Sequence, residues 1–219
     1  MNWRCAAASL LLTVPASAAT VTFKTVDGVT IEADYQPADK GQSTAILVHG
    51  VAAGRGEWEG FAAALRRRGM GTLAVDLRWH GELSQRPDVV WAKGAEDILA
   101  AARFLKKRGV AEDQLVLIGA SIGANLCSQA FTALPKTRAL VLLSPGADYR
   151  GVRLSRFPAA RALAASSPAD AYAHATVEQL RQLLPGLTVF EAKSGHGAQM
   201  FADLDFVDAL VAWLSKRPS

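Results

Sequence analysis

The stretch Leu-Val-Leu-Ile-Gly-Ala-Ser-Ile-Gly at residues 115–123 decides the fold. Its first four residues form a continuous apolar run, which is typical of a strand buried on both faces of a parallel sheet. A helical segment follows directly, so the chain must turn sharply at Ser121. Such a turn lifts the serine oxygen clear of the backbone, and Gly119 and Gly123 avoid steric conflict where the chain doubles back. The stretch therefore predicts an exposed, reactive serine, with the N–H of Ile122 facing a developing negative charge.

Apolar runs of the same kind recur on both sides of this stretch, at residues 45–48, 73–75 and 139–143. Strand-like runs also appear at 161–166, where the signal is weak, and at 187–192. Helical spacing separates them, at residues 58–65, 98–105, 122–134, 171–184 and 204–216. Two alternating runs at 21–25 and 29–35 flank Asp27-Gly28, which is a strong hairpin signal. We therefore predict an α/β fold with a mostly parallel central sheet, an amino-terminal antiparallel hairpin and helices on both faces.

Length and composition support one globular domain. The chain has 219 residues, of which 50% are hydrophobic, and this is enough to bury a core and excludes a disordered chain. The net charge is only +4, and no long basic block is present. We therefore expect no nucleic-acid partner.

The amino terminus has the three-part layout of a secretory signal peptide. Arg4 is followed by an apolar run at residues 5–14 and by the small residues Ala16-Ser17-Ala18. We predict a leader at 1–19, a mature domain at 20–219, and a periplasmic or secreted protein. Removal of the leader leaves Cys127 as the one cysteine, so the mature chain has no intramolecular disulfide. No later stretch is long and apolar enough for stable membrane insertion.

A serine nucleophile needs a base, and the chain offers four histidines: His49, His80, His174 and His196. His196 lies in Ser-Gly-His-Gly, between the last predicted strand and the last predicted helix. A glycine-flanked loop at the carboxyl end of a strand can project a ring over the sheet edge, where open α/β sheets place their sites. We therefore assign His196 as the base.

The acid that orients the base has two candidates. Asp170 follows a weak strand and precedes a predicted helix, so its carboxylate also fits an N-cap role. Asp148, which follows the run at 139–143, is the rival. We favour Asp170.

The chain order Ser121, Asp170, His196 is the order expected for a nucleophile elbow of the α/β-hydrolase fold. The sequence resembles the small α/β hydrolases of the serine-esterase and dienelactone-hydrolase-like group across the mature chain. His49-Gly50 resembles the oxyanion loop of that group, and residues 76–81 resemble its usual loop after the next parallel strand.

The resemblance implies that the backbone N–H groups of Val51 and Ile122 form the oxyanion hole. True dienelactone hydrolases carry cysteine at the elbow, whereas this chain has Ser121. Cys127 lies six residues further on, and we predict that it is a small buried side chain. The resemblance therefore supports serine chemistry.

Only about twenty residues follow the run at 139–143 before the next weak strand, which leaves room for one short helix and no large cap. We expect an open site for a small-molecule substrate. Aromatic and methionine side chains near loop ends are candidates to line it: Trp58, Trp79, Tyr149, Phe157 and Met200. The predicted activity is cleavage of carboxylic esters or thioesters through an acyl-enzyme, with no cofactor and no metal. Peptide or lactone cleavage by the same triad and a non-catalytic binding protein are the alternatives, and the sequence leaves the oligomeric state open.

Overall fold

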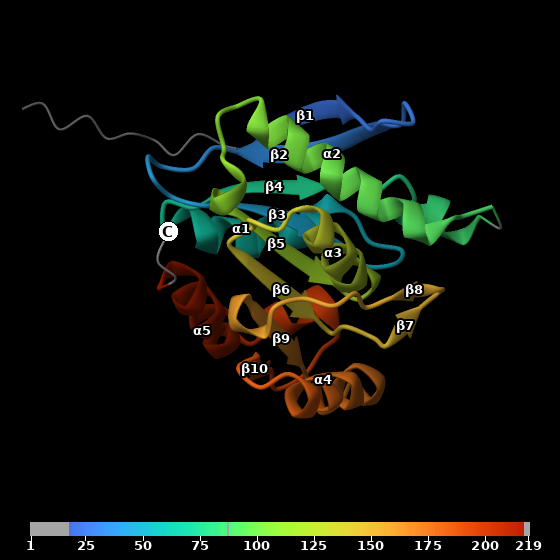
Figure 1. Cartoon of the computed structure of the whole chain (residues 1–219), viewed down its shortest axis with the longest axis vertical. Helices are drawn as coiled ribbons and strands as arrows, with labels where there is room; N and C mark the ends of the chain where they lie inside the picture. The colour runs from blue at the N-terminus through green and yellow to red at the C-terminus, as the bar shows by residue number, and fades with distance from the viewer. Residues whose placement is uncertain (1–17, 87, 217–219) are drawn as a thin grey trace, which may run out of the picture.

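The computed structural model describes residues 18–86 and 88–216, which are arranged around an eight-stranded sheet in the order β1-β2-β4-β3-β5-β6-β9-β10 (Figure 1). In that order the strands are Ala19–Lys24, Thr30–Gln36, Gly71–Val75, Thr44–Val48, Leu115–Ala120, Ala139–Leu143, Ala162–Ser166 and Thr188–Glu191. The six strands β4, β3, β5, β6, β9 and β10 run parallel, whereas β1 and β2 form an antiparallel hairpin at the edge. The predicted leader, except for Ala18 and Ala19, lies outside the described residues.

Within the described residues, five α-helices cover the sheet: α1 (Glu59–Arg66), α2 (Gly94–Lys106), α3 (Ile122–Ala133), α4 (Ala171–Leu183) and α5 (Leu204–Ser215). Short 3-10 turns occupy Arg55–Trp58, Gly81–Gln85, Trp91–Lys93, Glu112–Gln114, Ala159–Arg161 and Gly197–Ala202. None of the helices in the described part of the chain is long and apolar enough to cross a membrane.

The helices form a layer on each side of the sheet. Alternate residues of β3 enter two separate cores: Ile46 and Val48 pack with α2, α3 and α4, while Leu47 packs with α1 and α5. Strands β3, β4, β5, β6 and β9 are therefore buried along their whole length, because apolar side chains on both faces find helices to pack against.

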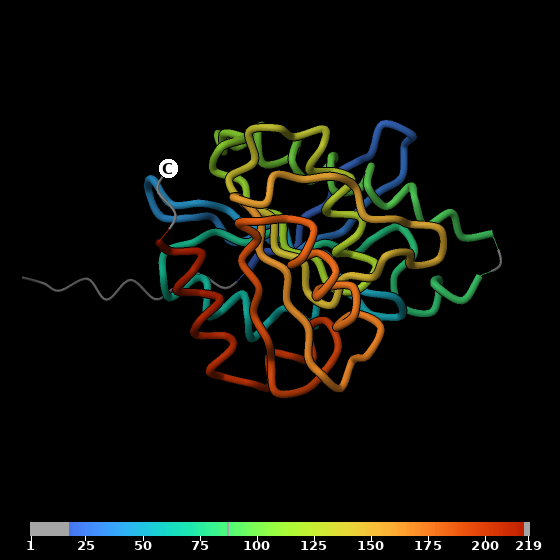
Figure 2. Tube along the Cα trace, turned by 60° about the horizontal axis from the view of Figure 1, so that its bottom comes forward, coloured from blue at the N-terminus to red at the C-terminus, as the bar shows by residue number. Residues whose placement is uncertain are grey.

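The segment between β6 and β9 forms no large cap. It holds a two-stranded hairpin, β7 (Asp148–Tyr149) and β8 (Val152–Arg153), and one 3-10 turn, where we expected room for a short helix. Figure 2 shows this segment in yellow and orange, lying against the body of the molecule. Between β6 and β9 the chain therefore adds only this small hairpin and a 3-10 turn to the carboxyl-end edge of the sheet.

Arg78, in the loop after β4, ties the amino-terminal hairpin to α2. Its guanidinium lies 2.7 Å from Asp97 and 2.6 Å from Asp27, which is in the β1–β2 turn. The Asp97 side chain is fully buried, and the hydrogen bond from Arg78 holds the pKa of Asp27 at about 2. The loop at residues 76–81 thus has a structural role in addition to its place beside the sheet edge.

Candidate active site

Ser121 lies at a strained turn between β5 and α3. Its φ of 56° and ψ of −126° are unusual for a residue other than glycine, and its N–H donates to the Leu143 carbonyl at 2.8 Å. Strained backbone of this kind costs on the order of 1–3 kcal/mol and is concentrated at functional positions. The turn has the geometry that the Gly-Ala-Ser-Ile-Gly stretch predicts.

The glycines beside Ser121 are required by close packing. A Cβ on Gly119 would lie 2.2 Å from the carbonyl oxygen of Gly123, and a Cβ on Gly123 would lie 2.4 Å from that of Val48. Any larger side chain would therefore push α3 away from β5 or from the end of β3.

His196 and Asp170 form a hydrogen-bonded pair. The Nδ1 of His196 lies 2.6 Å from the Asp170 carboxylate, which is largely buried, while the imidazole is half exposed. Asp170 occupies the N-cap position of α4, but its side chain makes no capping bond there, and its backbone carbonyl accepts from the N–H of His174. The carboxylate is thus free of the competing N-cap role and faces the imidazole.

The rival acid, Asp148, lies elsewhere. Its carboxylate accepts from the Gly151 N–H at 2.7 Å and pairs with Arg153 at 3.1 Å, so it stabilises the β7–β8 hairpin. The structure therefore brings Asp170, and not Asp148, to His196.

The loop that carries His196 packs directly on the Ser121 turn. Gly197 donates its N–H to the Ser144 hydroxyl at 2.9 Å. A Cβ on Gly197 would lie 3.1 Å from that of Ala120 and 3.8 Å from the Ser121 nitrogen. The sequence neighbours of Ser121 and His196 are therefore in contact, although 75 positions separate the two residues in the chain.

His49 is a buried structural residue that orients the loop at 49–51. Its Nε2 accepts from the Leu77 N–H at 3.0 Å, so its Nδ1 carries the proton that is donated to the Gly50 carbonyl at 2.7 Å. Burial lowers the pKa of His49, which keeps the ring neutral. Because C=O and N–H point in opposite directions across a trans peptide, the Val51 N–H faces away from His49.

Two backbone segments lie beside Ser121, the loop at Gly50–Val51 and the start of α3. A Cβ on Gly50 would lie 3.1 Å from that of Ser121, so the backbone that leads into Val51 passes close to the serine. Ile122 is the first residue of α3, where a helix has no internal acceptor for its N–H. The assignment of Val51 and Ile122 to an oxyanion hole stays a prediction and is part of the proposal below.

The other histidines lie apart from Ser121. His80 bonds the Leu77 carbonyl at 3.0 Å, and the His174 ring lies 3.3 Å from the hydroxyl of Ser166. Ser166 is almost completely buried at the end of β9. In the described chain, no carboxylate bonds the His174 ring, so this second serine–histidine pair lacks an orienting acid.

The aromatic candidates divide into two groups. Tyr149 and Trp79 are half-buried, and the Tyr149 ring lies edge-on to the His196 ring with centroids 6.3 Å apart. Trp58 and Met200 are fully buried, and Phe157 is 8% exposed. The expectation that these last three line the opening is wrong, because their side chains pack in the two cores.

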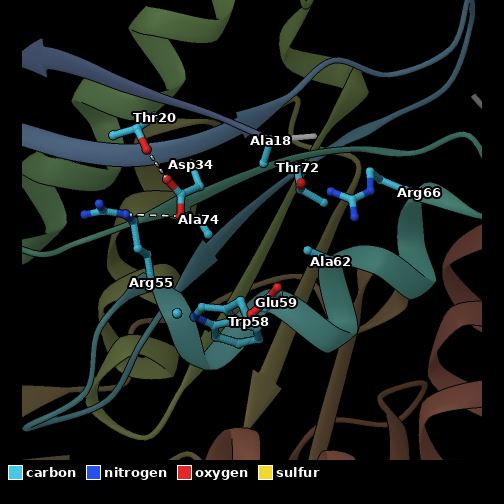
Figure 3. Close-up of a pocket in the computed structure, with 11 residues that line it drawn as sticks. Ala18, Thr20, Asp34, Arg55, Trp58, Glu59, Ala62, Arg66, Thr72 and Ala74 are labelled. Atoms are coloured by element: carbon cyan, nitrogen blue, oxygen red, sulfur yellow. Dashed lines mark hydrogen bonds and ion pairs between the residues drawn. The ribbon is translucent and has the colours of Figure 1, made fainter. Parts of the chain in front are cut away.

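A cavity of about 420 Å³ lies between the amino-terminal strands and α1 (Figure 3). Trp58 lies against it, as do Arg55 and Asp34, whose charged groups are 3.1 Å apart. Neither Ser121 nor His196 is among its lining residues. This cavity is therefore separate from the candidate active site.

Glu57 is an ionisable group beside the loop at residues 49–51, and no sequence pattern pointed to it. Glu57 is exposed as a whole residue, but desolvation of its carboxyl group raises the pKa to about 7, and a hydrogen bond from the Gly50 N–H opposes the rise. No local pattern marks this residue, because its environment depends on how residues 49–57 fold back on themselves. Perturbed acids are concentrated at functional sites.

Other reactive groups have no place at this site. Cys127 lies in the core on α3, where burial raises the pKa of its thiol. Within residues 18–86 and 88–216, no group of three or more His, Cys, Asp and Glu side chains is arranged to hold a metal ion.

Solved structures share this fold at low sequence identity. The dienelactone hydrolase from Anabaena variabilis has a TM-score of 0.68 and 17% identity, over 91% of this chain and 95% of its own. A serine hydrolase without lid from Xanthomonas campestris has a TM-score of 0.67 and 20% identity, over 92% and 93%. A Pyrococcus furiosus esterase has a TM-score of 0.67 and 15% identity, over 92% and 93%. At these identities the likeness concerns the fold alone.

Sequence comparison gives the family. Among curated proteins, none matches this sequence. The family model described as "Alpha/beta hydrolase family" matches residues 45–219, which include the Ser121 turn and the His196–Asp170 pair. The chain therefore belongs to the alpha/beta hydrolase family.

Proposed function

We propose that this hydrolase is a serine enzyme that cleaves carboxylic ester or thioester bonds of small molecules through an acyl-enzyme. The observation that carries the proposal is the His196–Asp170 pair, because the loop that holds His196 packs against the Ser121 turn. A serine, a histidine and a buried carboxylate in this order are the parts that nucleophilic acyl transfer requires.

In the proposed reaction, the Nε2 of His196 takes the hydroxyl proton as Ser121 attacks the acyl carbon. Asp170 accepts from Nδ1, which holds the ring in the correct tautomer and stabilises the imidazolium. The N–H groups of Val51 and Ile122 bind the oxyanion, and His49 holds the Gly50–Val51 peptide in place. The intermediate expels the alcohol or thiol, protonated by His196. Water then attacks the acyl-enzyme with the same base and releases the acid.

The surroundings of the site support small substrates. The β7–β8 hairpin replaces a large cap, and the imidazole is 42% exposed. The esterase and dienelactone hydrolase among the similar structures are consistent with this substrate class. We also propose that the protein is exported after removal of residues 1–19, on the basis of the leader pattern.

A fluorophosphonate probe tests the proposal. The probe phosphonylates serines that a neighbouring base activates, and mass spectrometry of the digested protein identifies the modified residue. We expect a single adduct on Ser121 in the folded protein, and none after denaturation. An adduct on Ser166, or no adduct on folded protein that also fails to hydrolyse short-chain esters and thioesters, would contradict the proposal.

The carboxyl group of Glu57 is expected to affect the pH profile. Because its pKa is raised to about 7, Glu57 is neutral at pH 6 and negatively charged at pH 8.5, where its charge opposes the nearby oxyanion. We expect Glu57→Gln to match the wild-type kcat/KM at pH 6 and to exceed it by about threefold at pH 8.5. Glu59→Gln, on the exposed start of α1, serves as the control. A ratio of variant to wild type that does not change with pH would contradict this role.

A further inference from the structure

The β7–β8 hairpin holds Tyr149 in one place above the sheet edge. Its two-residue turn, Arg150-Gly151, has φ of 54° and 82°, which is the backbone of a tight hairpin whose twist matches its strands. Arg150 also lies over the Trp91 ring, with its guanidinium carbon 5.5 Å from the ring centroid. The hairpin is therefore anchored at its tip.

Asn125 joins this hairpin to the helix that follows the nucleophile. Its side chain is fully buried, and its amide donates to the carbonyls of Gly146 and Val152 at 2.8 and 2.7 Å. Its oxygen accepts from the Gly146 N–H at 3.3 Å. Asn125 lies one helical turn after Ser121, so the positions of the hairpin and of the nucleophile are coupled.

The Tyr149 side chain is fixed on three sides. Its hydroxyl donates to the Ser144 carbonyl at 3.3 Å, and its ring lies edge-on to those of Tyr172 and His196. A Cβ on Gly146 would lie 2.7 Å from ring atoms of both tyrosines. Glycine at this position thus makes room for the phenol.

The phenol hydroxyl lies beside the Ser121 turn. It bonds the Ser144 carbonyl at 3.3 Å, and Leu143, the residue before Ser144, accepts from the Ser121 N–H at 2.8 Å. In the sheet, β5 lies between β3 and β6. Strand β3 leads into the proposed oxyanion loop, and strand β6 leads toward Tyr149. Strands β9 and β10, which lead into Asp170 and His196, lie beyond β6. Tyr149 therefore shares the His196 side of Ser121.

The leaving group of an ester must occupy that same side, because the imidazolium of His196 has to protonate it. Building on the proposed ester hydrolysis, we propose that the Tyr149 hydroxyl is a further catalytic group, which donates a hydrogen bond to the leaving alcohol oxygen. As the tetrahedral intermediate collapses, the bond between the acyl carbon and the alcohol oxygen breaks. The proton on that oxygen comes from Nε2 of His196, and Tyr149 keeps its own.

The chemistry of the phenol suits a donor that is not itself deprotonated. Burial and the charge of Asp170 raise the pKa of Tyr149 to about 12, although the Ser121 hydroxyl lowers it in part. The hydroxyl is therefore protonated at neutral pH. Its bond to the Ser144 carbonyl is long, so little is lost when it turns to the substrate.

Tyr149→Phe tests the proposal because it removes the hydroxyl and keeps the ring. Ethyl acetate and p-nitrophenyl acetate give the same acetyl-enzyme but differ in how much help the leaving oxygen needs. We expect kcat/KM, which reports acylation, to fall by about tenfold or more for ethyl acetate and by less than about threefold for p-nitrophenyl acetate. Tyr35→Phe, on β2 and away from the site, is the matched control and is expected to change neither value.

Three other outcomes would overturn the inference, each for a different reason. Equal losses for both esters would show a purely structural role of the phenol and would overturn the inference. Equal gains would show that Tyr149 only competes for the Ser121 proton, and would also overturn it. Wild-type protein that hydrolyses neither ester and takes up no fluorophosphonate would overturn the proposed function, and this inference with it.

Discussion

Ser121→Ala is expected to lower kcat by about 10⁶-fold, the largest effect of any single change, because the acyl-enzyme can no longer form. The fold should persist, since alanine keeps the Cβ of serine and adds no bulk at the turn. The backbone bond to Leu143 does not involve the side chain. Ester hydrolysis measures the loss, and circular dichroism with thermal unfolding shows that the variant is folded.

Ser166→Ala is the matched control for this experiment. Ser166 is the other serine with a histidine beside it, but it is almost completely buried and its His174 lacks a carboxylate partner. We expect this variant to keep wild-type kcat within about threefold. A large loss in Ser166→Ala together with a small loss in Ser121→Ala would show that the nucleophile is misassigned.

Asp170→Asn is expected to lower kcat by about 10⁴-fold. The amide can donate to Nδ1 of His196, which favours the tautomer whose proton is on Nε2 and leaves no lone pair to receive the serine proton. The variant also removes the negative charge that stabilises the imidazolium. Steady-state kinetics on a short-chain ester would measure the effect, with KM expected to change little.

Asp148→Asn is the control for the acid. Asparagine keeps the oxygen that accepts from the Gly151 N–H, and the ion pair with Arg153 that it removes is exposed. Exposed pairs contribute roughly 0–1 kcal/mol to stability, so we expect kcat within a few-fold of wild type. If Asp148→Asn were the damaging change and Asp170→Asn the mild one, the acid would be wrongly assigned.

The Ser121 turn could be predicted from sequence because its determinants are local. A buried strand, two glycines and a helix start lie within nine residues, and the steric conflict at Gly119 is with Gly123 itself. The close contact at Gly123 is with Val48 on β3 and depends on tertiary structure. The central strands were likewise readable, since burial on both faces leaves continuous apolar runs. The weak run at 161–166 and the run at 187–192 also proved to contain strands, β9 and β10.

The lining of the site could not be predicted in the same way. Trp58 and Met200 lie near loop ends, but position along the chain does not tell which way a side chain points, and both point into the core. The β7–β8 hairpin has strands of two residues, too short for any periodic signal. It also places a residue other than glycine, Arg150, at positive φ.

The surroundings of Asp170 and of the loop at residues 49–51 depend on contacts between distant segments. Asp170 has the sequence context of an N-cap, and only the folded loop at His196 draws its carboxylate away from α4. From sequence alone, His49 is another candidate base. In the structure, the N–H of Leu77, 28 residues away, bonds its ring and determines its tautomer. Local pattern names the candidate residues, and tertiary structure selects among them.

The backbone angles at position 121 carry an evolutionary consequence. Glycine adopts that conformation with less penalty than serine, so heat resistance alone would favour glycine there. Among variants selected only for stability at high temperature, glycine should accumulate at position 121. These variants should unfold at higher temperature and should lack any activity that requires the serine hydroxyl. Persistence of the serine under such a screen would mean that the bend is not under strain.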